Sequence, residues 1–328
     1  ILHALIFILL ILCISLASPI PWTGAEPFCC LFTRGGSIHR DEVERRWNSL
    51  LEDCSGDWSG SIGWFDILYD DNQDAVGILC PRKDNRERNM RLSFHPSPET
   101  ENVANWVVYH ARGQGIKEEI VLEKHASENS PLEKKQLFYC FEGGILGRTG
   151  LDFQTLPVIE HGYWDQGTRR TVVLTFGKGN KTLTKICFVQ QEKQENDLEF
   201  DVSSTDPSHV PVLPNKPSST LEQLQDRWRA LQLKKAESIL SDRTRQVLKK
   251  SNALNRLLVG TADNDDGERI LRVVLPNNVV LACPFYFDEK SSFRILMACQ
   301  TKSEVVQVVE FHFFHACIER VTASYYCM

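Results

Sequence analysis

The sequence predicts an all-β fold made mainly of antiparallel strands, and three observations support this. Between residues 58 and 190, nine short runs of strand-like composition follow one another, joined by polar turns such as Asp70-Asp71-Asn72. No helix of crossover length separates them, which argues against a parallel α/β sheet. Within the stretch 138–190, short apolar runs alternate with Gly-rich and polar breaks, as in an antiparallel β-meander.

The length and charge limit the function classes. The 328 residues suit two domains of roughly 150 residues each. The net charge of −6 argues against a nucleic-acid partner held through phosphates, because no basic stripe with interleaved aromatic residues offsets it. The chain has no G-x-S-x-G elbow, phosphate loop, H-E-x-x-H motif or dinucleotide fingerprint. These absences argue against a hydrolase, a kinase or a dehydrogenase, and an enzyme built on a barrel mouth stays compatible with the sequence.

The first 36 residues form a segment of their own. Residues 1–17 are apolar apart from His3 and Ser15, and two prolines follow shortly after. This pattern resembles a secretory signal or a marginal membrane anchor, since about 20 apolar residues span a bilayer. The alternative is a spurious extension, so a membrane partner is expected only if the apolar run is retained.

The first β domain is predicted at 37–192. It opens with an amphipathic helix over 41–53, in which four apolar residues including Trp47 share one face. Gly56-Asp57-Trp58 then begins the first strand. A large flat side chain at this place closes the core at one end of a small barrel, so Gly56 and Trp58 are interpreted as a structural plug.

A β-hairpin over 168–190 ends this domain. Val172, Leu174 and Phe176 alternate with their neighbours and therefore lie on one strand face. A polar turn at 177–180 leads into the partner strand. Arg170 lies on the same face as Val172 and is expected to point into the barrel or across its end.

A linker and a second domain are predicted at 193–219 and 220–328. The linker is charged and then rich in serine and proline. After a cap at Ser219 or Thr220, an amphipathic helix begins that either continues beyond Trp228 or gives way there to a strand. Strands are predicted at 270–275, 279–287, 293–300 and 304–321, so the two halves look like a weak repeat of a short helix and a β-meander.

Neither a metal site nor a disulfide framework is predicted. The eleven cysteines are scattered without a C-x-x-C motif, and most are expected to be small buried residues. His312 and His315 are three apart on a predicted strand, so their rings face opposite sides. The run 263–267 looks like a calcium loop, but the alignment puts Ala262 and Val273 at ligand positions.

Several short motifs, taken together, carry a resemblance to a known family. They are Trp47, GDWSG at 56–60, FEGG at 141–144, IEHGY at 159–163, Arg169-Arg170, and LPNNV at 275–279 followed by Cys283-Pro284. In these the chain resembles the domain-of-unknown-function 3598 family of cyanobacteria, algae and plants, over about 42–190 and less well from 271. That family is lipocalin-like, belongs to the calycin superfamily and is distantly similar to phycobiliprotein chromophore lyases.

The resemblance implies two tandem lipocalin-like up-and-down β-barrels, each preceded by a short helix, and a plastid location. The second copy is diverged, because DRWRA at 226–230 lacks both glycines of the expected G-x-W-x-G pattern. A secretory or membrane location, implied by the apolar run at 1–17, remains the alternative.

The candidate ligand site is built around Arg170. A buried guanidinium needs a partner, which Glu142 or Glu160 would supply. In one interpretation Arg170 anchors a ligand carboxylate such as a propionate. In the other, it stacks over Trp58 and seals the barrel. The aromatic residues expected around the ligand are Trp64, Phe141, Tyr163 and Trp164.

Three functions follow as hypotheses. The leading one is a non-catalytic protein that binds or chaperones an apolar, acid-bearing small molecule such as a tetrapyrrole. The second is an enzyme of the chromophore-lyase type, which attaches a bilin to a cysteine of a client protein. The third is an assembly factor whose barrel is filled by its own side chains. No catalytic residue is assigned.

Overall fold

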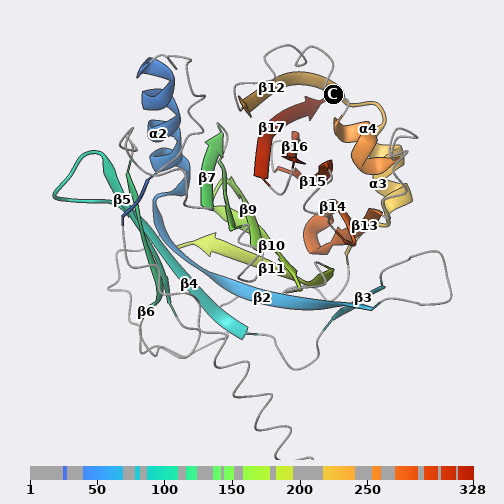
Figure 1. Cartoon of the computed structure of the whole chain (residues 1–328), viewed down its shortest axis with the longest axis horizontal. Helices are drawn as coiled ribbons and strands as arrows, with labels where there is room; N and C mark the ends of the chain where they lie inside the picture. Colours follow the sequence, from blue (N-terminus) through green and yellow to red (C-terminus); the bar gives the residue numbers. More distant parts are fainter. Residues whose placement is uncertain are drawn as a thin grey trace, which may run out of the picture.

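Two β-sheets make up most of the protein, as its computed structural model shows (Figure 1). The structure describes residues 25–27, 40–68, 78–81, 87–109, 116–123, 136–141, 144–150, 158–177, 182–194, 217–240, 253–259, 270–286, 292–301, 304–314 and 317–328. The prediction of a mainly antiparallel, all-β, lipocalin-like fold is confirmed. No helix in these ranges is long and apolar enough to cross a membrane.

The first sheet is a curled half-barrel. Its strands are β1 (Ala25–Pro27), β2 (Gly56–Leu68), β3 (Ile78–Pro81), β4 (Glu87–Pro96), β5 (Val103–Tyr109), β6 (Ile116–Glu123), β7 (Gln136–Phe141), β8 (Ile145–Gly150), β9 (Val158–Asp165), β10 (Thr168–Phe176) and β11 (Leu183–Lys193). They are hydrogen-bonded in the order β1-β6-β5-β4-β2-β11-β10-β9-β8-β7, with β3 paired to β2. Among the strand pairs of the described residues, only the short pair β1–β6 is parallel. The early strand β2 pairs with the late strand β11, which joins the two arms of the curl.

The curl stays open on one side of the described chain. An even number of antiparallel pairs separates β6 from β7 in the sheet, so these two strands run in the same direction. Consecutive strands joined by a simple hairpin run in opposite directions, so β6 and β7 are not joined in that way. Helix α2 (Arg40–Cys54) lies across the end of the curl and buries Trp47 and Leu50 there (Figure 1). The amphipathic helix predicted at 41–53 is therefore confirmed within one residue at each end.

The second sheet contains six strands. They are β12 (Gln232–Leu240), β13 (Ile270–Leu275), β14 (Val279–Pro284), β15 (Ser292–Gln300), β16 (Val306–Phe314) and β17 (Cys317–Cys327), in the order β12-β17-β16-β15-β14-β13. A short 3₁₀ turn, η3 (Pro276–Asn278), joins β13 to β14. The earliest strand, β12, pairs with the last, β17, much as β2 pairs with β11 in the first sheet.

Two short helices cover the outer face of the second sheet. Helix α3 (Leu221–Trp228) begins with a capping box in which Thr220 and Gln223 bond each other's backbone N–H. Helix α4 (Ala253–Leu258) buries Leu254 and Leu257 next to Trp228. Because α3 ends at Trp228 and β12 begins at Gln232, the predicted helix neither continues nor turns directly into a strand at Trp228.

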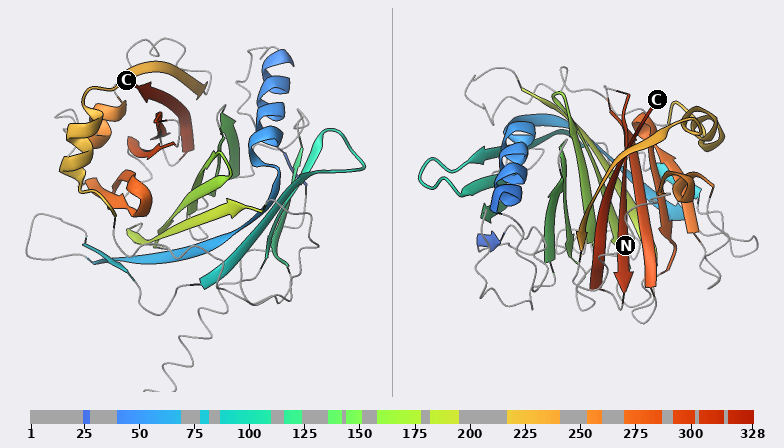
Figure 2. Two further views of the ribbon diagram at one scale, coloured as in Figure 1. Left: turned by 180° about the vertical axis from the view of Figure 1, so that it is seen from behind. Right: turned by 90° about the horizontal axis from the view of Figure 1, so that it is seen from above.

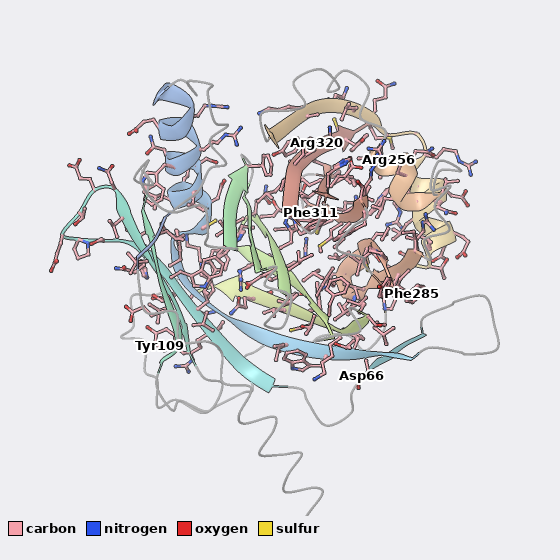
Figure 3. All side chains as sticks on the ribbon, viewed as in Figure 1. Asp66, Tyr109, Arg256, Phe285, Phe311 and Arg320 are labelled. Atoms are coloured by element: carbon pink, nitrogen blue, oxygen red, sulfur yellow. The ribbon has the colours of Figure 1, made fainter. Side chains whose placement is uncertain are left out.

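The two sheets pack face to face and share one hydrophobic core. Figure 2 shows the second sheet lying against β9, β10 and β11 of the first. The core combines Val172, Leu174 and Phe176 of β10 with residues of the second sheet such as Met297 and Phe311, the second of which is labelled in Figure 3. β11 ends at Lys193 and α3 begins at Leu221, on either side of the predicted linker. Side chains of the first sheet therefore cover the inner face of the second sheet.

Two segments that the sequence predicts as single strands each form two strands in the structure. The run predicted at 137–146 divides into β7 and β8, because Gly144 turns the chain with a positive φ of 73°. The run predicted at 304–321 divides into β16 and β17. Between β16 and β17 the apolar pattern continues through the turn and hides it from periodicity, whereas Glu142-Gly143-Gly144 interrupts the pattern between β7 and β8.

Candidate functional site on the concave face

The concave face of the curled sheet holds the candidate site. Leu92 and Trp106 from one arm of the curl join Leu146 and Trp164 from the other arm in a single buried cluster, so these side chains point into the curl. Cross-strand pairing places Arg169 of β10 opposite Trp164 of β9, on the same face. The next residue, Arg170, therefore points out of the curl.

Three tryptophans fill the end of the curl below α2. The Trp58 and Trp164 rings meet edge to face with centroids 4.8 Å apart, and Trp106 and Trp164 do so at 6.3 Å. Trp58 Nε1 donates a hydrogen bond to Cys54 O at 3.0 Å, and this bond connects the start of β2 to the end of α2. We call Trp58, Trp106 and Trp164 the tryptophan cluster.

Arg169 is a buried cation beside this cluster. Only 2 % of its surface is exposed, and its guanidinium lies 4.8 Å from the centroid of Trp164 and 5.5 Å from that of Trp106. Nη2 is 3.3 Å from Glu160 Oε1, and Nη1 donates to Gln191 Oε1. A charge at this depth is stabilised by such a counter-ion and amide.

Two buried hydrogen-bond donors lie next to Arg169. Trp164 Nε1 and Thr171 Oγ1 are buried and have no hydrogen-bond partner in the structure. Both converge over Gly162, since a Cβ on that glycine would lie 3.2 Å from each of them. A buried donor without an acceptor costs about 1–3 kcal/mol, so a ligand oxygen at this place would be favoured.

An apolar patch continues the same face away from the tryptophan cluster. Ile62, Cys187 and Val189 are buried there, and Trp64 and Val173 pack against them while keeping part of their surface exposed. Along β10, Thr171 lies between Arg169 and Val173. The face thus changes from aromatic to polar to apolar along one direction.

Comparison with solved structures identifies the fold. A protein of unknown function from the DUF3598 family of Nostoc punctiforme matches with a TM-score of 0.52 at 12 % sequence identity. The match covers 86 % of this chain and 98 % of that chain. Because neither sheet alone makes up so large a share of this chain, the match includes both sheets. The chain has the fold of the DUF3598 family. No family model and no curated protein matches the sequence itself.

The DUF3598 fold therefore confirms the resemblance inferred from the motifs at the level of structure. Of the two residues interpreted as a structural plug, Trp58 is 1 % exposed in the concave core, and Gly56 begins β2 with a φ of 131°. A side chain at Gly56 would meet Lys193, whose ammonium lies 5.8 Å from the Trp58 ring.

Arg170 does not line the concave face of this DUF3598 fold. It shares a face with Val172, as expected, but that face packs on the second sheet. Its Nη1 donates to Cys299 Sγ and to Gln300 O, both at 3.2 Å. Arg170 therefore neither stacks over Trp58 nor pairs with Glu160, whose carboxylate binds Arg169 instead.

The other predicted site residues divide between the two faces. Trp64, Trp164 and Glu160 lie on the concave face. Tyr163 and Phe141 belong to the core between the sheets, where the Tyr163 ring lies 4.5 Å from that of His161. Glu142 lies outside the described residues.

Sequence reasoning missed Arg169, Gln191, Thr171 and Gly162. The alternation along β10 separates its two faces correctly, but both faces are apolar enough to be buried. Only the presence of the second sheet decides which of them faces the curl.

Three buried cysteines are poor nucleophiles. Burial raises the pKa values of the Cys54, Cys283 and Cys299 thiols above their ordinary value. At neutral pH these three side chains are neutral and pack as small apolar groups. No group of three or more His, Cys, Asp or Glu residues in the described ranges is arranged to hold a metal ion.

Proposed function

We propose that the protein is a non-catalytic binding protein for a small, largely apolar molecule with an acidic group, held on the concave face of the curled sheet. The observation that carries this proposal is the pair of buried donors, Trp164 Nε1 and Thr171 Oγ1, that converge over Gly162 beside the buried cation Arg169. All three groups donate hydrogen bonds, so they suit an acceptor that carries negative charge.

The acidic end of the ligand would bind beside Arg169. A guanidinium and a carboxylate match in geometry and charge, and their hydrogen bonds are stronger than neutral ones. Glu160 neutralises Arg169 in the absence of ligand. A ligand carboxylate would therefore compete with Glu160 for the same guanidinium.

The apolar part of the ligand would lie on the patch around Trp64. Trp64 and Val173 retain exposed surface there, while Ile62, Cys187 and Val189 form an apolar floor. Flat aromatic ligands gain both buried area and ring contacts on such a surface. A tetrapyrrole combines a flat apolar ring system with propionate groups, so we keep it as the leading ligand class.

The test compares ligand binding by matched variants. Protein purified from its native source is examined by absorbance spectroscopy and mass analysis, and the ligand-free protein is titrated with protoporphyrin IX while tryptophan fluorescence is followed. We expect quenching in the wild type. The double variant Arg169→Met/Glu160→Gln avoids leaving Glu160 as an unpaired buried charge, and should bind about tenfold more weakly than Glu160→Gln alone.

A control variant changes the neighbouring arginine. Arg170→Met alters a contact between the sheets and should leave protoporphyrin affinity unchanged. If no ligand co-purifies and no quenching occurs, the proposal fails. The remaining candidate is then an assembly factor with a filled barrel, which is favoured by the tryptophan cluster packed into the end of the curl.

A further inference from the structure

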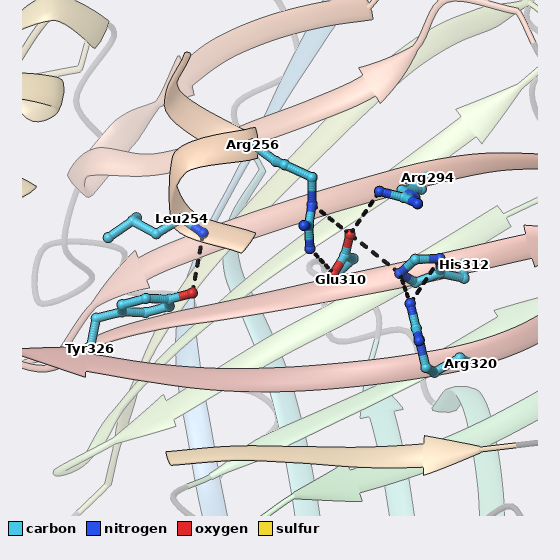
Figure 4. Close-up of polar contacts among 7 residues, drawn as sticks. All are labelled: Leu254, Arg256, Arg294, Glu310, His312, Arg320 and Tyr326. Carbon is cyan, nitrogen blue, oxygen red and sulfur yellow. Dashed lines mark hydrogen bonds and ion pairs between the residues drawn. The ribbon is translucent and has the colours of Figure 1, made fainter. Parts of the chain in front are cut away.

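Two arginines and a histidine between them form a row across the outer face of the second sheet. Arg294 of β15, His312 of β16 and Arg320 of β17 are direct cross-strand neighbours, since Arg294 pairs with His312 and His312 with Arg320. Neighbouring strands are about 4.8 Å apart, so the three side chains stand side by side. Figure 4 shows them converging next to Glu310.

Glu310 is the acidic side chain of this cluster, and Arg256 of α4 already binds it. Arg256 Nη2 lies 2.7 Å from Glu310 Oε2, and its Nε donates to Oε1 at 3.1 Å. Burial opposes ionisation of Glu310, but the contacts with His312 and Arg256 outweigh it and hold the pKa at about 2. Glu310 and Arg256 thus form a charge-balanced pair.

Arg294 is held much less firmly than Arg256. Its Nη1 is 3.9 Å from Glu310 Oε1, which is beyond hydrogen-bonding distance, and 48 % of its side chain is exposed. Arg294 therefore has room to turn toward a ligand in solvent while Arg256 continues to neutralise Glu310.

His312 lies between the carboxylate of Glu310, which accepts hydrogen bonds, and the guanidinium of Arg320, which donates them. Its Nε2 lies 3.2 Å from Glu310 Oε1 and 2.5 Å from Arg320 Nη2. A carboxylate only accepts hydrogen bonds and a guanidinium only donates them. Burial and the charges of Arg320 and Arg294 lower the pKa of His312, so its ring is neutral at pH 7. Arg320 Nη2 also lies 3.2 Å from Nδ1, so the neutral ring can donate to Glu310 through Nε2 and accept from Arg320 through Nδ1. The cluster therefore combines three guanidiniums, of Arg256, Arg294 and Arg320, with one carboxylate and a neutral histidine.

We propose that this row binds a phosphate or a phosphate monoester, with Arg294 and Arg320 donating to its oxygens above His312. Glu310 is one carboxylate among three guanidiniums, and Arg256 binds it most closely, so an oxyanion at this place would balance the remaining positive charge of the cluster. It would also give the exposed Arg294 an acceptor at hydrogen-bonding distance, which Glu310 Oε1 at 3.9 Å does not provide. This site is on the opposite side of the second sheet from the inter-sheet core and does not depend on the ligand proposed for the concave face.

Phosphate suits the row better than a carboxylate. The two arginines flank His312 on separate strands, so their donors reach the ligand from two sides. A tetrahedral dianion presents oxygens in several directions and carries enough charge for two guanidiniums. A single carboxylate has only two oxygens in one plane.

The experiment measures binding of three probes to the full chain: inorganic phosphate, glycerol phosphate and acetate. NMR follows the His312 ring, and thermal unfolding gives affinities. Phosphate should raise the pKa of His312 and the unfolding temperature, and acetate should do neither. Binding of inorganic phosphate alone would identify the free ion as the ligand, whereas equal or tighter binding of glycerol phosphate would identify a monoester.

Matched arginine variants decide whether the row is the site. Arg294→Gln should weaken phosphate binding by about tenfold or more, because one charge-assisted contact is lost. It should also fold normally, since Arg294 is half exposed. The control is Arg229→Gln, which changes an exposed arginine at the end of α3 that pairs with Asp226 and is not part of the row. Equal phosphate affinity in the two variants, equal binding of acetate, or no response of His312 would overturn the proposal.

Discussion

The two arginines of the Arg169-Arg170 pair have unrelated environments, because a strand sends successive side chains to opposite faces. Arg169 lies in the curl beside the tryptophan cluster and binds Glu160. Arg170 reaches the second sheet and donates to Gln300 O. The pair thus combines a candidate ligand anchor with a residue that joins the two sheets.

Glu160→Gln should tighten the binding of acidic ligands on the concave face. The change keeps the size and a hydrogen-bonding oxygen near Arg169, but removes the carboxylate that competes with the ligand. We expect a several-fold lower Kd for protoporphyrin IX, measured by tryptophan quenching.

A neutral ester of the same porphyrin is the control for the effect of charge. Its affinity should be similar in wild type and Glu160→Gln. An unchanged or higher Kd for the acid in the variant would show that Glu160 does not compete with the ligand.

Sequence reasoning reached part of this site and missed its centre for a physical reason. Trp58, Trp64 and Trp164 were recognised because large aromatic side chains in a β-meander are most often buried. Arg169 was missed because a period of two defines two faces without saying what covers each. Both faces of β10 are buried, one by the curl and the other by the second sheet.

At the scale of elements, Gly144 precedes β8 in a left-handed backbone conformation. Gly144 has a φ of 73°, and Trp164 N donates to its carbonyl at 2.6 Å. A Cβ at Gly144 would lie 2.0 Å from Trp164 O, which is backbone and cannot move aside. Gly144 therefore positions Trp164 as well as the start of β8.

Gly144→Ala should destabilise the protein much more than Gly167→Ala. Both glycines have nearly the same positive φ, 73° and 76°, so the cost of about 1–2 kcal/mol for a left-handed conformation is common to both. At Gly167, however, the nearest atom to an added Cβ is Lys193 Cβ at 3.8 Å, an ordinary contact. We expect Gly144→Ala to lower the free energy of unfolding by at least about 2 kcal/mol more, measured by urea denaturation. Equal losses in the two variants would show that the clash at Trp164 O is relieved at little cost.

At the scale of the whole molecule, the inter-sheet core contains a buried histidine. The His161 ring lies 5.6 Å from Phe311 of the second sheet, and burial lowers its pKa to about 3. In the unfolded chain a histidine titrates near pH 6.5. Between these two values the unfolded chain binds a proton that the folded protein does not.

The free energy of unfolding should therefore fall as the pH is lowered from 6.5 toward 3, by up to about 4 kcal/mol from His161. His312 contributes with the same sign, because its pKa is also lowered, and Glu310 contributes only below pH 4.5. The variant His161→Phe isolates the effect: its pH dependence should be flatter than that of the wild type. Parallel curves for the two proteins would mean that His161 takes up its proton in the folded state.

The shared core also predicts that the two sheets unfold together, although the sequence reads as two tandem domains. Separating the sheets would expose both faces of that core at once, including Leu174 and Phe311.

Two buried thiols report on the two sheets: Cys54 lies at the end of the curl and Cys283 in the inter-sheet core. In increasing urea, both should become reactive toward a thiol reagent over the same concentration range, as read by peptide mass analysis. Leu174→Ala should shift both midpoints down together, by about 2–5 kcal/mol of stability. Labelling of Cys283 at a urea concentration that leaves Cys54 protected would instead mean that the second sheet opens as a separate unit.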